Sequence, residues 1–114
     1  MHYKKPAILA AEAASAKMGE DIVVLDVRKL TVVTDYFVIV TVNSLPQAQA
    51  VRDEMEDSLT ELGMTLRNRQ QQLSKRWLLL DFDGVIAHIF IKDAREFYCL
   101  EKLWSKAVKV KWEK

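Results

Sequence analysis

Residues 77–91 constrain the fold more than any other stretch, because two apolar runs there flank the dipeptide Asp83-Gly84. Asp-Gly is a favoured two-residue turn between antiparallel strands, since both central positions of a type I′ turn need a positive φ. A loop of this length also sets the register: Phe82 pairs with Val85, and the pairs further from the turn follow. The sequence therefore predicts a β-hairpin over residues 77–91.

The expected register gives the hairpin two faces of different composition, because side chains alternate across a strand. One face is purely apolar and is predicted to be core: Leu78, Leu80, Phe82, Val85, Ala87 and Ile89. The other face carries Trp77, Leu79, Asp81, Ile86, His88 and Phe90. Large aromatic groups beside a carboxylate and an imidazole are typical of a protein interface. They also occur where a helix covers the edge of a layer, and the residues alone favour neither interpretation.

Helical and extended patterns alternate along the rest of the chain. Helices are expected at residues 6–17, 44–62 and 93–108, and strands at residues 22–27, 36–42 and 64–69, with residues 70–72 as a polar loop. Ser44 and Gln47 mark the best-defined helix start, because a capping hydroxyl and a glutamine three residues later satisfy the first turn. The acidic outer face of that helix is expected to be solvated, with a docking surface for a basic partner as the alternative. The interleaved order predicts an α/β or α+β fold with a mixed sheet, in one domain over residues 1–114.

Composition excludes several classes of function. Lys and Arg outnumber Asp and Glu by only 17 to 16, so net charge indicates neither a general nucleic-acid binder nor a membrane-surface protein. Cys99, expected to be a buried thiol, has only His2 and His88 as further soft ligands, too few for a zinc site. No apolar run approaches the ~20 residues that span a bilayer, and no transit segment is recognised. A cytoplasmic protein, from a bacterium rather than an organelle, is expected.

Lysines gather at the C-terminal end of the sequence. From Lys102 onward there are five lysines and one acid, Glu113. A solvated, frayed basic tail over about residues 105–114 is the expected structure. A weak phosphate-facing patch is the alternative, and direct contact with RNA is expected to be absent or minor.

Asp81 and Asp83 form the one motif that suggests catalysis. Two such carboxylates on a strand would face the same way and could hold magnesium for nucleotidyl transfer. The motif is short and common, Asp83 also serves the turn, and no glycine-rich phosphate loop or Walker-type lysine accompanies it. His88 has no nucleophile beside it in sequence, so it is not expected to be a general base. We therefore expect no catalytic residue, metal or cofactor, with a magnesium-dependent nucleotidyltransferase as the alternative.

Six segments of the chain, in their order and spacing, resemble the ribosomal silencing factor family, also called Iojap-like. They are residues 21–27, 34–39, 77–81, 85–90, 95–98 and 100–104. The resemblance implies a nucleotidyltransferase-like fold without catalytic residues, in which helices flank both faces of a mixed sheet. It also implies a translation repressor that docks on ribosomal protein L-fourteen of the large subunit. There it would keep the small subunit from joining when nutrients are short.

The resemblance further implies a set of partner-binding residues: Trp77, Asp81, His88, Arg95 and Tyr98. Trp77 would be the apolar anchor and Asp81 the acceptor for a basic side chain, with His88 and Tyr98 as a hydrogen-bonding rim. Three of the five lie on the mixed face of the predicted hairpin, which favours the interface interpretation of that face. Whether two copies of the chain form a homodimer is left open.

This sequence departs from the family pattern at the tip of the hairpin. The family usually has Gly-Asp there, whereas this chain has Asp83-Gly84. A two-residue turn tolerates the inversion, but an interaction made by the second-position carboxylate would disappear or move.

Overall fold

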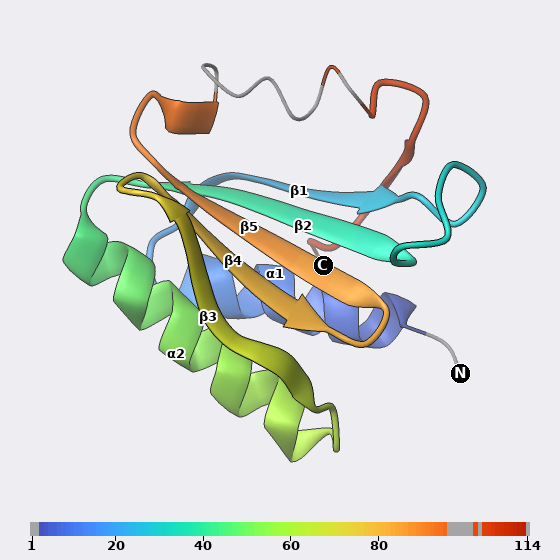
Figure 1. Cartoon of the computed structure of the whole chain (residues 1–114), viewed down its shortest axis with the longest axis horizontal. Coiled ribbons are helices and arrows are strands. Elements are labelled where there is room, and N and C mark those ends of the chain that lie inside the picture. The colour runs from blue at the N-terminus through green and yellow to red at the C-terminus, as the bar shows by residue number, and fades with distance from the viewer. Residues whose placement is uncertain (1–2, 96–101, 103, 114) are drawn as a thin grey trace.

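The computed structural model describes residues 3–95, 102 and 104–113, with the backbone alone for residues 68–74, and its strands form one six-stranded mixed sheet (Figure 1). The elements are α1 (Lys4–Ala16), β1 (Glu20–Asp26), β2 (Tyr36–Val42), α2 (Leu45–Glu61), β3 (Leu66–Ser74), β4 (Trp77–Phe82), β5 (Val85–Ile91) and β6 (Val108–Val110). The strand order is β3-β4-β5-β2-β1-β6. β2 and β5 pair in parallel and the other neighbours are antiparallel. This confirms the expected mixed α/β class.

Helices α1 and α2 pack against each other and against one face of the sheet, which we call the helical face (Figure 1). α1 presents small side chains, with Ala7, Ala10 and Ala14 fully buried, so its backbone can approach the sheet closely. α2 contributes Met55 and Leu59 to the same core. Neither helix has the length and apolar character that a membrane crossing needs. The apolar side of the hairpin joins this core as predicted: Leu78, Leu80, Phe82, Val85, Ala87 and Ile89.

The start of α2 confirms the predicted cap and also joins the two helices. The Ser44 hydroxyl accepts a hydrogen bond from the Gln47 backbone N–H at 3.2 Å, and the Gln47 side-chain oxygen accepts one from Asn43 N–H at 2.8 Å. The Gln47 amide nitrogen then donates to the carbonyl oxygens of Lys17 and Met18, just past the end of α1. One capping residue therefore satisfies backbone groups at the end of one helix and the start of the next.

The hairpin of β4 and β5 has the predicted register, from Phe82 opposite Val85 to Trp77 opposite Phe90. Its turn, however, is not the expected type I′. Gly84 has a φ of +84°, while Asp83 is not among the residues with positive φ. A positive φ at the second central position alone is the pattern of a type II turn.

Tyr3 explains why glycine occupies the second position of this turn. A Cβ on Gly84 would lie only 2.2 Å from the Tyr3 ring, so the ring fills the space that a side chain would need. The Tyr3 hydroxyl donates to Asp83 Oδ2 at 3.1 Å, and this hydrogen bond raises the pKa of Tyr3. The inverted Asp83-Gly84 order thus suits this chain, because the carboxylate meets the hydroxyl and the glycine makes room for the ring.

Two edge strands differ from the sequence-based expectations. The predicted polar loop at residues 70–72 lies within β3, which pairs with β4 along the sheet edge. Polar residues are tolerated in an edge strand, so a run of glutamines did not indicate a loop there. The predicted frayed tail contains β6, in which Val110 pairs with Val24 of β1. Beyond β6, the Trp112 indole N–H donates to the Ile22 carbonyl oxygen at 3.1 Å.

The opposite side of the sheet, which we call the distal face, carries a second core. Its buried members are Leu25, Val27, Phe37, Ile39, Ile86, Phe90 and Ala94. Trp104 and Ala107 pack onto this cluster from the chain that follows β5. Of the helix expected at residues 93–108, Ala94, Arg95 and Lys102 are helical, and residues 96–101 and 103 lie outside the described part. Residues 104–106 form a turn and Val108 begins β6, so the predicted end of this helix is wrong. The helices described in full, α1 and α2, cover the helical face alone.

Candidate protein-interaction site

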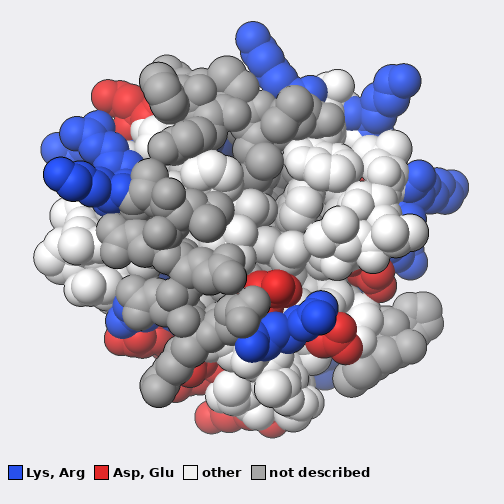
Figure 2. Space-filling model, in the orientation of Figure 1, with Lys and Arg blue, Asp and Glu red and all other residues white. Residues whose placement is uncertain are grey.

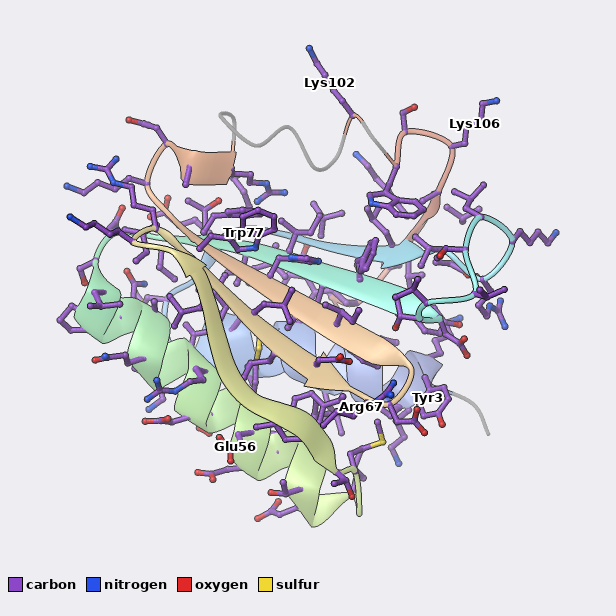
Figure 3. The ribbon with its side chains drawn as sticks, viewed as in Figure 1. Tyr3, Glu56, Arg67, Trp77, Lys102 and Lys106 are labelled. Carbon is purple, nitrogen blue, oxygen red and sulfur yellow. The ribbon has the colours of Figure 1, made fainter. Side chains whose placement is uncertain are left out.

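Strand pairing places three of the predicted site residues on the distal face. Three rows of directly paired residues cross the sheet, each with one residue from β2, one from β5 and one from β4. The rows are Thr41, Phe90 and Trp77; Ile39, His88 and Leu79; and Phe37, Ile86 and Asp81. Directly paired residues share a face, so Trp77, His88 and Asp81 lie together. Trp77 projects from β4 on the side away from α2 (Figure 3). The predicted mixed face of the hairpin is confirmed.

Five rings on this face form what we call the aromatic cluster: Phe37, Trp77, His88, Phe90 and Trp104. The rings of Trp77 and Phe90 have centroids 5.1 Å apart, and those of His88 and Phe90 are nearly parallel at 6.2 Å. Phe37 meets both His88 and Trp104 edge-on, each at 5.1 Å. Offset and edge-on aromatic pairs contribute about 0.5–1.5 kcal/mol each beyond area burial. The cluster therefore holds its members in fixed positions.

His88 lies inside the aromatic cluster and not at its rim, where the resemblance implied it would be. Its side chain is 5% exposed, and burial lowers the pKa of His88 to about 4, so the imidazole is neutral near pH 7. The Trp77 indole N–H donates to His88 Nδ1 at 3.1 Å. Because Nδ1 accepts, the proton of the neutral ring is on Nε2. That N–H is buried and has no hydrogen-bond partner in the described structure.

This arrangement makes His88 a support for Trp77. An imidazole acceptor fixes the rotation of the indole, while Phe90 packs beside both rings. Leaving the Nε2–H without a partner lowers the stability of the fold by about 1–3 kcal/mol. The imidazole therefore accepts the hydrogen bond from Trp77 at the expense of stability. Trp77 itself is half-buried, and so is Asp81 four residues along β4. A rigid indole with a carboxylate on the same strand face is suited to anchoring a protein partner.

Arg95 lies at the end of the distal face, beyond the row of Thr41, Phe90 and Trp77. Its guanidinium donates to Thr41 Oγ1 at 3.2 Å and to the carbonyl oxygen of Asp21. It lines a polar hollow of ≈ 360 Å³, whose other residues are Glu20, Asp21, Thr41, Asn43, Lys92 and Asp93. Arg95 is therefore positioned by backbone and hydroxyl oxygens near the aromatic cluster. Tyr98 and Cys99 lie outside the described residues.

The two carboxylates of the catalytic alternative are placed differently from each other. Asp81 lies on the distal face of β4, whereas Asp83 is exposed in the turn and accepts a hydrogen bond from Tyr3. Within the described ranges, no group of three or more His, Cys, Asp or Glu side chains could hold a metal ion. This geometry does not favour a magnesium site.

Sequence reasoning missed two members of the aromatic cluster, Phe37 and Trp104. The run from residue 36 to residue 42 is apolar on both sides, so alternation could not assign Phe37 to a face. Trp104 reaches Phe37 from 67 positions along the chain, and no local pattern indicates such a contact.

Comparisons with known proteins agree with this fold. The family model described as "Ribosomal silencing factor during starvation" matches residues 1–114. The chain is 39% identical to the ribosomal silencing factor RsfS of Bacillus subtilis over 107 residues, which cover 94% of this chain and 91% of that protein. It is 36% identical to the chloroplastic protein Iojap of Zea mays, covering 91% of this chain and 45% of that protein.

A solved structure extends the likeness to three dimensions. A crystal structure of a protein from Chromobacterium violaceum, 29% identical, superimposes with a TM-score of 0.85 and covers 92% of this chain and 88% of that one. The family model spans the segments that form the hairpin, the central parallel pair and the aromatic cluster. The chain belongs to the family of ribosomal silencing factors.

Proposed function

We propose that this protein represses translation by binding the large ribosomal subunit through ribosomal protein L-fourteen, with the distal face around Trp77 as its docking surface. Membership of the silencing factor family gives it a ribosome-associated, regulatory role. The observation that supports this particular face is the aromatic cluster, in which a buried, neutral imidazole holds the indole of Trp77. Aromatic anchors of this kind carry much of the binding energy at protein interfaces.

The size of the molecule is sufficient for steric exclusion. Its principal extents are 33 × 32 × 29 Å, so in any orientation it would hold two joining surfaces well apart. A standard interface needs ~800 Å² from each partner, about one eighth of the 6753 Å² surface of this chain. A single copy can therefore bind firmly and block subunit joining, without making or breaking a bond and without a cofactor.

Asp81 adds specificity to this docking surface. It is half-buried on the same face as Trp77, and Ile86 is its neighbour on β5. A carboxylate beside apolar groups is less screened by water, so it interacts strongly with a basic side chain of the partner. We assign it the role of acceptor for a Lys or Arg of L-fourteen, in the cytoplasm where ribosomal subunits join.

Sedimentation with separated ribosomal subunits tests this proposal directly. We expect the purified protein to migrate with large subunits and not with small ones, and to reduce the fraction of joined ribosomes when both are mixed. A protein that stays at the top of the gradient while subunits join normally would contradict the proposal. A control variant, Leu62→Ala at the end of α2 and away from the distal face, should act like the wild type.

A further inference from the structure

The described lysines of the C-terminal segment lie on or near an anchored strand. β6 pairs with β1, with Val110 opposite Val24. Trp112 donates a hydrogen bond to the Ile22 carbonyl oxygen and packs against the core of the helical face. A lysine on a frayed tail gains little from meeting an anion, because binding would have to order the tail. Lysines beside an anchored strand avoid much of that entropy loss.

Three of these lysines lie on the side of the distal face. Lys102 and Lys106 extend away from the sheet on the side opposite α2 (Figure 3). Lys109 pairs with Leu25, whose side chain belongs to the distal core, so Lys109 shares that face. All three side chains are exposed, and none has an ion-pair partner among the described residues. They form what we call the lysine edge.

The near-zero net charge of the chain hides a separation of charge. α2 carries five acids and one base, Arg52, which pairs with Asp53 at 2.9 Å. Acidic side chains lie along the lower edge of the molecule in Figure 2, where Figure 1 places α2, and basic side chains project from the upper edge, near the C-terminal segment, and from both sides. Near a polyanion, such a molecule orients with its lysine edge toward the polyanion and with α2 away from it. The distal face then points toward the polyanion as well.

We propose that Lys102, Lys106 and Lys109 contact phosphate groups of ribosomal RNA beside the protein docking site. This inference rests on the proposed function, because it assumes that the distal face meets the large subunit. Phosphates are the densest anionic groups on that surface, and lysine suits them as a compact point charge. Three contacts are too few to bind free RNA well, but after docking they act at high effective concentration. The lysine edge therefore strengthens binding without making the chain a general RNA binder.

The salt dependence of binding to large subunits tests the inference. The test variant replaces all three lysines: Lys102→Gln, Lys106→Gln, Lys109→Gln. Its plot of log affinity against log salt concentration should be less steep than that of the wild type by about 2–3. Each phosphate that is no longer neutralised accounts for roughly 0.7–0.9 of this change in slope. Raising salt from about 50 to 200 mM should then weaken the wild type about 20–40-fold more than the variant. A matched control, Lys4→Gln, Lys5→Gln, Lys17→Gln, changes the same charge on and beside α1 and should keep the wild-type slope.

Binding to isolated L-fourteen distinguishes a failure of this inference from a failure of the proposed function. We expect the wild type and the triple lysine variant to bind isolated L-fourteen equally, since no RNA is present. An equal loss on L-fourteen and on the subunit would assign the lysines to an acidic protein surface and overturn the inference. An unchanged slope on the subunit, or an equal change in the α1 control, would overturn it too. Failure of the wild type to bind either target would instead refute the proposed function.

Discussion

The two faces of the sheet are built from the same strands and differ in what they bury. On the helical face, alternate residues of β4 and β5 are aliphatic or phenylalanine, and they meet alanines of α1 and apolar residues of α2. On the distal face, the intervening residues bring together two tryptophans, a buried imidazole and a half-buried carboxylate. An N–H without a partner is buried on the distal face and belongs to His88.

Within one hairpin, the helical face therefore serves stability, and the distal face is the one that we assign to recognition. The helical face follows the rules of a well-filled core, with small residues where the helices approach. The distal face keeps an unsatisfied donor and holds an indole partly exposed. Departures of this kind are expected at functional sites, where stability is given up for a specific arrangement.

Neighbouring leucines of β4 provide the strongest test of the contrast. Leu80 faces the helices and is fully buried, while Leu79 faces the distal side and is half-buried. We expect Leu80→Ala to lower the free energy of unfolding by about 2–5 kcal/mol, because it leaves a cavity in a filled core. Leu79→Ala should cost distinctly less, since less apolar area is lost. Urea unfolding of both variants measures this, and equal losses would remove the distinction between the faces.

The pH dependence of stability tests the buried imidazole. The folded-state pKa of His88, about 4, lies below its ordinary value of 6.5, so its contribution is present above pH 6.5 and is lost as pH falls toward 4. Between pH 7 and pH 4 we therefore expect the free energy of unfolding of the wild type to fall by about 3 kcal/mol more than that of His88→Phe, which has no titratable ring at this position. Urea unfolding at several pH values between 7 and 4 gives the difference. Parallel curves for the two proteins would mean that the imidazole is solvated or paired.

Trp77 tests whether the distal face is a recognition surface. We expect Trp77→Ala to weaken binding to large subunits by about 2 kcal/mol or more, roughly 30-fold, as a hot-spot residue does. Trp77→Phe keeps a ring but removes the N–H that bonds His88, so an intermediate loss would separate the apolar contact from the positioning hydrogen bond. Binding assays on both variants, each checked for folding by circular dichroism, give the answer. Wild-type affinity in Trp77→Ala would remove this residue from the interface.

Local chemistry explains which parts of the fold could be predicted. The two-residue loop determined the hairpin register, and Ser44 with Gln47 determined the start of α2, because both depend on neighbours in the chain. β6 was missed although Val108, Val110 and Trp112 alternate with lysines, since the run is short and its partner strand is remote.

The candidate site was only partly predictable for the same reason. The alternation of the hairpin brought Trp77, Asp81 and His88 to one face, and the strand pairing confirms this. The bond between Trp77 and His88 depends on side-chain geometry across two strands, which alternation does not determine. Trp104 joins through packing between distant segments, so only the folded chain reveals it.

The pairing of β6 with β1 has a consequence for how the protein is made. β1 is synthesised well before β6, so β1 remains an uncovered edge of the sheet until β6 has left the ribosome. Trp104 and the lysine edge emerge with that same segment. A nascent chain thus lacks part of its aromatic cluster and its lysine edge until this segment has emerged. The surfaces that we assign to ribosome binding are therefore completed later than the rest of the sheet.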